Sequence, residues 1–237
     1  MSDLPIGPPV DSTPRPLPPR GTKLRGTYVE LEPLHPRHAE DLFRAADPGT
    51  ARGDGSWTYL GYGPFASVAE VARFLGEFCA QADHVAWAVR PVATGVASGW
   101  LTLMNIEPKN AAIELGNIWL GPAMQRTRAA TEAFLLPLKL AADDLGYRRL
   151  VWKCNALNAP SIRAALRLGF VAEGVHRAAM TTKGRRRDTA WFSILADEWP
   201  RARDAMQAWL AADNFAPDGT AKRGMAEIRA GIIPNTE

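Results

Sequence analysis

The chain has 237 residues and a formal net charge of +3, and 46% of its residues are hydrophobic while 22% are charged. These values fit one globular domain with additional terminal segments, and a charge of +3 is too small to indicate nucleic-acid binding by itself. Two cysteines exclude a disulfide framework, and no long apolar run follows a basic start, so we expect a cytoplasmic protein without a signal peptide or a membrane span.

The first segment, residues 1–22, contains seven prolines and little that a core could bury, which predicts a disordered, proline-rich arm. We expect the ordered domain to cover residues 23–212. Its first strand is predicted at 27–34 as an edge strand, because Pro33 cannot donate a hydrogen bond to a neighbouring strand and ends it. A helix over 37–46 is predicted to follow.

The middle of the chain alternates between turn residues and apolar runs. A loop rich in glycine and aromatic residues, 53–65, precedes a helix predicted over 67–81. The spacing of the next segments indicates an antiparallel meander of three strands, at 84–90, 96–105 and 111–120.

A proline interrupts the helix that follows this meander. The helix is predicted over 126–144, and Pro137 removes one backbone donor, which is expected to kink or split it. The later predicted elements are a strand at 148–154, a short helix at 158–170, a hairpin of strands at 171–178 and 188–195, and a helix at 198–212. The segment 213–237 is a C-terminal tail whose isoleucines, Ile228, Ile232 and Ile233, could dock on the domain.

The turn between the strand 111–120 and the next helix is basic and contains a threonine. A helix N-terminus has free backbone N–H groups and the positive end of the helix dipole, so it can bind an anion. Arg126 and Arg128 could add charge-assisted contacts to phosphate oxygens. The structural alternative is a capped core helix with arginines that face solvent.

Taken in order, these segments resemble the GNAT superfamily of acyl-CoA-dependent N-acyltransferases, and within it the RimJ/RimL-type protein N-acetyltransferases. The resemblance covers about residues 25–200 and is carried by Glu114-Leu115-Gly116, Trp119-Leu120, Gln125-Arg126, Thr131-Glu132-Ala133, Asn155, Asn158, Ser161 and Gly169-Phe170. It implies an α/β (α+β) fold with a central mixed, mostly antiparallel sheet of about seven strands, flanked by helices.

The resemblance also implies the reaction and the residues that bind its acyl donor. It implies an enzyme that transfers an acetyl group from acetyl-CoA to a primary amine, foremost a protein N-terminal α-amino group, by direct attack in a ternary complex. The implied CoA-binding residues are Trp119, Leu120, Gln125, Arg126, Thr127, Arg128, Ala129, Ala130, Asn155 and Asn158. Arg128 stands where the family has a glycine, which takes away some close approach of the backbone.

Three residues are the implied catalytic groups. Glu114 would act as the base for the amine, Ser161 as the acid for the departing thiolate, and Asn158 would contact the pantetheine or acyl region. Structural alternatives stay open: Glu114 could pair with a neighbouring strand, and Asn158 and Ser161 could cap the short helix. Many relatives carry a tyrosine acid in this helix, where this chain has Ala165.

The loop 53–65 is expected to wall the acceptor site through Trp57, Tyr59, Tyr62 and Phe65, or else to cover the core without a ligand. His35 and His38 lack a third ligand, so no metal is expected. Neither a membrane nor direct binding of nucleic acid is expected, and the protein is expected to be a monomer or a homodimer.

Two alternative functions remain open from the sequence. The first is acylation of a small molecule such as an amino acid or an antibiotic, with acetyl-CoA or succinyl-CoA as the donor. The second is a non-catalytic module that binds RNA or the ribosome through the basic hairpin of Lys183, Arg185, Arg186 and Arg187.

Overall fold

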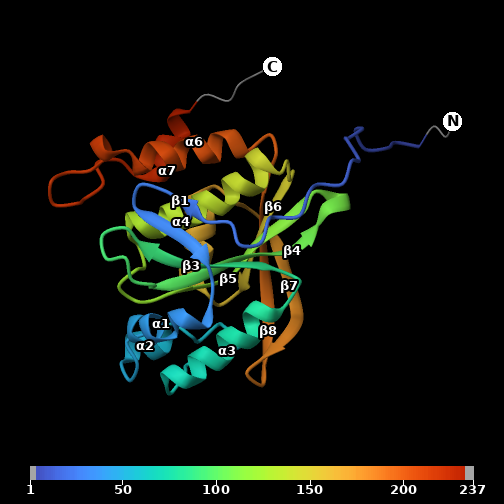
Figure 1. Cartoon of the computed structure of the whole chain (residues 1–237). Helices are drawn as coiled ribbons and strands as arrows, with labels where there is room; N and C mark the ends of the chain where they lie inside the picture. Colours follow the sequence, from blue (N-terminus) through green and yellow to red (C-terminus); the bar gives the residue numbers. More distant parts are fainter. Residues whose placement is uncertain (1–3, 233–237) are drawn as a thin grey trace.

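One mixed sheet organises the computed structural model, which describes residues 4–232 (Figure 1). Within that range the sheet has eight strands in the order β1-β2-β3-β4-β5-β6-β8-β7. The strands are β1 (Leu24–Arg25), β2 (Val29–Pro33), β3 (Val85–Pro91), β4 (Gly99–Glu107), β5 (Ala112–Leu120), β6 (Arg149–Asn155), β7 (Val171–Thr182) and β8 (Arg185–Leu195). Only β5 and β6 pair in parallel, so the predicted mixed, mostly antiparallel sheet is confirmed.

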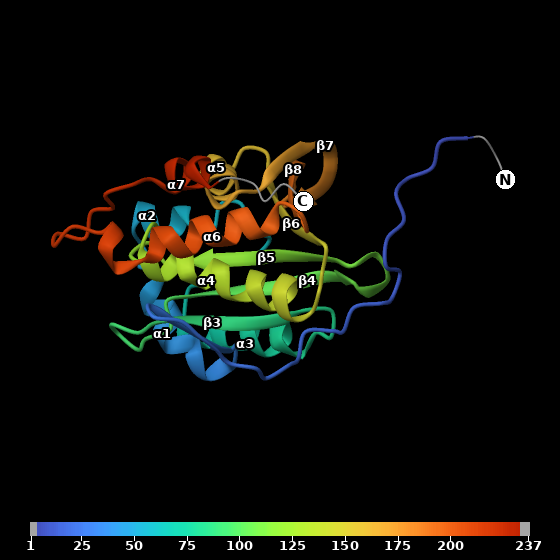
Figure 2. The ribbon, with the colours of Figure 1, turned by 90° about the horizontal axis from the view of Figure 1, so that it is seen from above.

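Helices cover both faces of this sheet (Figures 1 and 2). They are η1 (Pro36–His38), α1 (Ala39–Ala45), α2 (Ala51–Gly55), α3 (Val68–Ala80), η2 (Pro108–Asn110), α4 (Arg128–Lys139), η3 (Leu140–Asp144), α5 (Ala159–Leu168), α6 (Trp199–Leu210), η4 (Ala212–Asn214) and α7 (Met225–Gly231). Helices α4 and α6 lie over one face, and α1 and α3 lie over the other. The two faces carry separate hydrophobic cores, because successive side chains of a strand point to opposite sides.

Two predicted elements differ from the observed ones at the start of the sheet and at the hairpin. The strand predicted at 27–34 is not an edge strand, because the short strand β1 pairs with β2 on its outer side. The hairpin of β7 and β8 is longer than predicted and turns at Lys183 and Gly184, which have φ of 49° and 70°. A two-residue turn with positive φ fits the twist of two paired strands, so residues predicted as loop continue the ladder.

Pro137 interrupts the regular hydrogen bonding of its helix without ending it. It lies inside α4, and the next turn, η3, is a π-helical segment. Because proline has no backbone N–H, one hydrogen bond of the α-helical ladder is missing, and the wider turn follows directly after it.

Both terminal segments contact the domain. Residues 4–22 form no helix or strand, yet the amide of Arg15 donates to Pro108 O at 3.0 Å and Trp87 Nε1 donates to Thr22 O at 2.8 Å. At the other end, Met225 and Ile228 of α7 are buried in the main core. Of the isoleucines expected to dock, Ile233 lies outside the described residues.

Glu132 ties helix α4 to the first two strands. Its carboxylate is buried and accepts hydrogen bonds from the backbone N–H groups of Thr27, Tyr28 and Val29 at 2.9, 2.6 and 3.0 Å. A Cβ on Gly26 would lie 2.2 Å from Glu132 Cδ, so a larger residue at this position would displace the carboxylate from its hydrogen bonds. The contact fixes the helix against β1 and β2, and therefore also fixes the turn that precedes the helix.

Replacing Glu132 by glutamine is a conservative change, but it should destabilise the fold strongly. Glu132→Gln keeps the side-chain volume but turns one acceptor oxygen into an NH2 group, and hydrogen bonds to a charged acceptor contribute roughly 1.5–3 kcal/mol each. We expect the free energy of unfolding in urea to fall by about 3 kcal/mol. The exposed Glu77→Gln on α3 is the matched control, with a change within about 0.5 kcal/mol; equal losses would contradict this role for Glu132.

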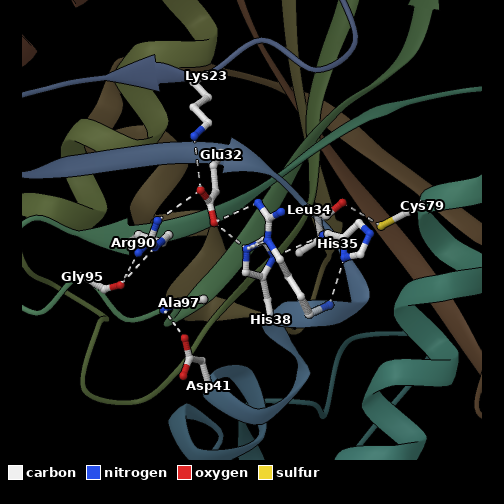
Figure 3. Close-up of polar contacts among 11 residues, drawn as sticks. Lys23, Glu32, Leu34, His35, His38, Asp41, Cys79, Arg90, Gly95 and Ala97 are labelled. Atoms are coloured by element: carbon white, nitrogen blue, oxygen red, sulfur yellow. Dashed lines mark hydrogen bonds and ion pairs between the residues drawn. The ribbon is translucent and has the colours of Figure 1, made fainter.

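A second buried carboxylate, Glu32 on β2, lies among four basic side chains (Figure 3). Its oxygens lie 2.6 Å from His38 Nε2 and 3.1 Å from an Arg90 nitrogen, with Arg37 at 3.5 Å and Lys23 at 3.8 Å. Burial raises the pKa of Glu32, but the hydrogen bond from His38 and the nearby positive charges outweigh it and lower the pKa. Burial lowers the pKa of His38 in spite of its contact with Glu32.

This cluster should make the fold sensitive to acid. Both pKa values are depressed in the folded state, so the unfolded chain takes up protons first as the pH falls. Stability is therefore lost first below about pH 6.5, where an unfolded histidine is protonated, and again below about pH 4.3, where an unfolded glutamate is. Urea denaturation at pH 7.5, 5.5 and 4.0 measures both steps.

The variant His38→Gln separates the two steps. Glutamine can still donate to Glu32 but takes up no proton, so the loss of stability between pH 7.5 and 5.5 should shrink while the loss below pH 5 remains. An unchanged loss between pH 7.5 and 5.5 would contradict the assignment to His38.

Candidate active site

The candidate site is a cavity where β5 separates from β6. The two strands pair only from Ala112 to Glu114 and from Arg149 to Val151. Beyond this point β6 stays paired with β8, while β5 follows β4 and carries Asn117 at a φ of 45°. A cavity of about 430 Å³ lies between them, bounded also by β8, the start of α5 and the loop around Tyr59.

Glu114 lies at the point of separation and lines the cavity. Its side chain is buried. Its Oε2 accepts a hydrogen bond from Asn105 Nδ2 at 2.7 Å and forms an ion pair with Lys153 Nζ at 2.9 Å. The Lys153 ammonium also lies 4.0 Å from the ring centre of Trp191. Glu114 therefore pairs with the neighbouring strand and faces the cavity at once, so the two sequence interpretations are compatible.

The end of β6 and the start of α5 bring three predicted residues to the same cavity: Asn155 from β6, and Asn158 and Ser161 from the N-terminus of α5. Asn158 caps the helix, since its Oδ1 accepts from the amide of Ser161 at 3.2 Å. Ser161 Oγ accepts from Trp152 Nε1 at 3.0 Å, which leaves the hydroxyl hydrogen available to a further acceptor. Asn155 Oδ1 bonds the amide of Leu157 at 2.9 Å.

No side chain at position 165 reaches the cavity. Ala165 has no exposed surface and belongs to the core beneath α5. The helix position that carries a tyrosine acid in relatives therefore supplies no proton donor in this chain.

The turn before α4 is the candidate phosphate site. Thr127 caps the helix, with its Oγ1 accepting from the amide of Ala130 at 3.0 Å. The amides of Arg128 and Ala129 belong to the first turn of the helix and have no partner within it. Arg126 is exposed with a φ of 67°, and Gln125 Nε2 donates to Leu120 O at 3.0 Å, which closes the turn.

The two arginines of this turn point to different surroundings. The Arg128 guanidinium lies 3.3 Å from the ring centre of Phe215 and 5.5 Å from that of Tyr28, so it packs against the C-terminal segment. Arg126 is exposed at the turn itself. A second cavity, of about 550 Å³, lies beside Tyr28 and Arg128 and is lined mainly by uncharged residues.

Most of the aromatic residues predicted for the acceptor site pack elsewhere. Trp57 stacks on Trp119 at 4.3 Å between ring centres, and Tyr62 and Phe65 pack beside them in the core under α1 and α3. Burial raises the pKa of Tyr62 to about 12. Of the predicted loop residues, Tyr59 lines the cavity.

The cavity also contains side chains that the sequence analysis did not assign to it: Lys153, His176, Arg187, Thr189 and Trp191. Arg187 was predicted to belong to an exposed loop, but it lies on β8 and turns inward. The sequence carries a partial signal, since polar residues at 187, 189 and 193 alternate with apolar residues at 190, 192 and 194, but Trp191 interrupts it. The predicted strand begins at residue 188 and therefore leaves Arg187 in the loop.

The described residues offer neither a metal site nor a membrane-spanning helix. Residues 4–232 contain no group of three or more His, Cys, Asp or Glu side chains that could hold a metal ion. His35 instead caps η1 by accepting from the amide of Arg37 at 3.1 Å, and His38 bonds Glu32. Among the helices of the same residues, none is long and apolar enough to cross a membrane.

The gap between β5 and β6 beyond Glu114, which we call the slot, fits the pantetheine arm of CoA, and the turn before α4 fits its phosphates. Beyond Glu114 and Val151 the facing backbone edges of β5 and β6 are unpaired, so their N–H and C=O groups are available to the amides of a pantetheine arm. The first-turn amides of α4, with Arg126 beside them, suit phosphate oxygens. Such a slot, with a carboxylate at its closed end, defines an acyl-CoA-dependent acyltransferase site.

The chain belongs to the GNAT acetyltransferase family. The model of the acetyltransferase (GNAT) domain matches residues 29–171, which is more than half of the chain. The fold resembles a GCN5-related N-acetyltransferase from Brucella melitensis with 43% identity and a TM-score of 0.88, over 92% of this chain and 98% of that one.

Two further relatives agree with this assignment. A GNAT-family acetyltransferase from Chromobacterium violaceum is 39% identical with a TM-score of 0.74, over 84% of this chain and all of that one. YdaF of Bacillus subtilis, whose name describes it as a candidate ribosomal N-acetyltransferase, is 22% identical over 73% of this chain and 93% of its own length. The protein is thus an acyl-CoA N-acetyltransferase with an amine acceptor, and its membership of the GNAT family, which the resemblance implied, is confirmed.

Removing the exposed arginine of the turn should weaken CoA binding. Arg126→Ala deletes a charge beside the free amides of α4, and a charge-assisted hydrogen bond contributes about 1.5–3 kcal/mol, so the dissociation constant for CoA should rise about tenfold or more. Isothermal titration calorimetry measures this change. Arg73→Ala, an exposed arginine of α3 on the opposite face, is the control. Unchanged affinity in Arg126→Ala would place the phosphates elsewhere.

Proposed function

We propose that this enzyme transfers the acetyl group of acetyl-CoA to an α-amino group, with a protein N-terminus as the acceptor. The observation that carries the proposal is the state of Glu114, the one carboxylate among the described residues that line the cavity. Lys153 and Asn105 both bind its Oε2, so one carboxylate, held on one oxygen, is the group that faces the amine.

A single carboxylate suits an amine that is already partly neutral at pH 7. An α-amino group has a pKa of about 8, so about a tenth of it is neutral at pH 7. A lysine side chain, with a pKa of about 10.4, needs about 4.6 kcal/mol to reach the neutral form at the same pH. Glu114 has no second carboxylate beside it in the cavity to supply that help, which favours the α-amine.

The residues of the cavity divide the proton transfers between them. Glu114 accepts the proton that the attacking amine loses, directly or through a water molecule. Ser161, held by Trp152 at 3.0 Å, has a hydroxyl hydrogen to give toward the sulfur that leaves. Unpaired backbone N–H groups of β5 and β6 are available as donors to the carbonyl oxygen as its charge develops.

The name of YdaF supports a ribosomal protein as the acceptor, since that protein matches this chain over most of both lengths. A cytoplasmic location agrees with such an acceptor and with two cysteines that are free in the structure. A free amino acid or another small amine carries the same α-amino chemistry and is the competing acceptor class.

The function is tested by acetyl transfer to matched amines. Peptides with a free N-terminus and an internal lysine are incubated with acetyl-CoA, and mass spectrometry locates the acetyl group. We expect it on the α-amine. The variant Glu114→Gln should lower kcat by about 100-fold, within the range of general-base catalysis, while the thermal shift caused by acetyl-CoA stays that of the wild type.

The exposed Glu77→Gln is the matched control for loss of a carboxylate. Wild-type turnover in Glu114→Gln would remove Glu114 as the base. Acetylation of the lysine alone would contradict the α-amine as the acceptor.

A further inference from the structure

Three side-chain polar atoms in the cavity have no hydrogen-bond partner. They are Arg187 Nε, Thr189 Oγ1 and Trp191 Nε1, and each is buried. Only two other buried side-chain polar atoms in the described residues lack a partner, and neither lines this cavity. Buried donors without partners are costly, so a cluster of them in one cavity indicates a ligand that supplies acceptors.

The three side chains share one face of the sheet because they alternate along β8. Across β6, Thr189 lies opposite Asn155 and Trp191 lies opposite Lys153. The intervening Ala190, Phe192 and Ile194 point into the core under α4 and α6. The cluster is therefore on the sheet face opposite α4, away from the turn where the phosphates of CoA are expected.

The charges in the cavity are not balanced. Its charged Lys, Arg, Asp and Glu side chains are Glu114, Lys153 and Arg187, and the first two form an ion pair. Within residues 4–232, no carboxylate lies within ion-pair distance of Arg187. Burial lowers the pKa of Arg187, while the nearby Cys154 and Glu114 raise it. The buried guanidinium therefore carries a desolvation cost that no ion pair among these residues offsets.

The hairpin that carries Arg187 is held over the cavity. Lys183 at its turn donates to Trp57 O at 2.9 Å, and Trp57 is locked in the second core. The neighbouring Arg186 is occupied by Asp188 at 2.9 Å, and Arg185 is exposed. Of the arginines at residues 185–187, Arg187 alone faces the cavity.

From this geometry we infer that Arg187, with Thr189 and Trp191, binds a carboxylate on the acceptor, close to the amine that reacts. The inference rests on the proposed function and narrows its substrate class to amines that carry a nearby carboxylate. The guanidinium can offer two parallel N–H donors to a carboxylate, and the hydroxyl and the indole N–H add one each. An acidic side chain at the start of a peptide and the α-carboxylate of a free amino acid present this same chemistry.

The test compares acceptors that differ by one functional group. The enzyme is given acetyl-CoA with peptides that begin with Asp or Glu and with the same peptides beginning with Asn or Gln, and kcat/KM is measured for each. A second arm compares free glutamate with its α-amide. We expect the carboxylate to raise kcat/KM by about 10- to 100-fold in the arm that matches the natural acceptor. These comparisons use the wild-type enzyme and need no variant.

Variants then assign the preference to the cluster. Arg187→Gln should abolish the preference, measured as the ratio of kcat/KM between acidic and amide acceptors, and Arg187→Lys should restore only part of it, because an ammonium lacks the planar fork. Arg185→Gln, two residues away and exposed, should keep the wild-type preference. Melting curves with acetyl-CoA confirm that each variant is folded.

The outcomes distinguish failure of the carboxylate-binding inference from failure of the proposed acetyl transfer to an α-amine. Equal rates for acidic and amide acceptors would overturn the inference and leave the proposed function standing. No transfer to any α-amine would overturn both. If Arg187→Gln instead lowers transfer from succinyl-CoA and leaves the preference among acceptors unchanged, the carboxylate belongs to the acyl chain and the inference is wrong.

Discussion

The separation of β5 from β6 is the constraint on which the rest of the site depends. Pairing stops after Glu114 and Val151, just before an irregularity in the pairing of β5 with β4 around Asn117, while β6 stays paired with β8. Two backbone edges then face each other without partners, and unpaired buried N–H and C=O groups are costly. A ligand rich in amides is the natural occupant of such a slot, and Glu114 stands where the slot closes. One departure from regular pairing thus creates the binding site and places the base in it.

Buried charges serve opposite purposes in different parts of this molecule. Glu132 and Glu32 are surrounded by donors from the protein itself, three backbone amides in one case and four basic side chains in the other. These carboxylates hold helix to sheet and strand to strand. Arg187 has no such partner among the described residues, and Glu114 has partners only on one oxygen. The two carboxylates with several protein partners therefore belong to the framework, whereas Arg187, the charged side chain without an ion-pair partner among them, lies in the cavity.

The local patterns of the sequence predicted the order of the elements well, because alternation, turn residues and helix caps act over a few residues. They also placed Asn158 and Ser161 at the start of the short helix as caps, whereas Glu114 was expected only through the resemblance to the GNAT superfamily. The directions in which side chains point were harder to predict from the sequence. Trp57 and Trp119 carry no local signal that they stack on each other, and Arg187 was hidden because the strand β8 begins three residues earlier than predicted. Both depend on tertiary packing.

Hydrogen exchange of the backbone amides, measured with and without acetyl-CoA, tests the central claim most directly. The unpaired edges of β5 and β6 and the first turn of α4 should exchange quickly in the free protein. Acetyl-CoA should then slow exchange in residues 115–130 and 151–158 far more than elsewhere. Protection confined to residues 27–28 and 91–98, on the other wall of the second cavity, or no protection at either place, would contradict the account.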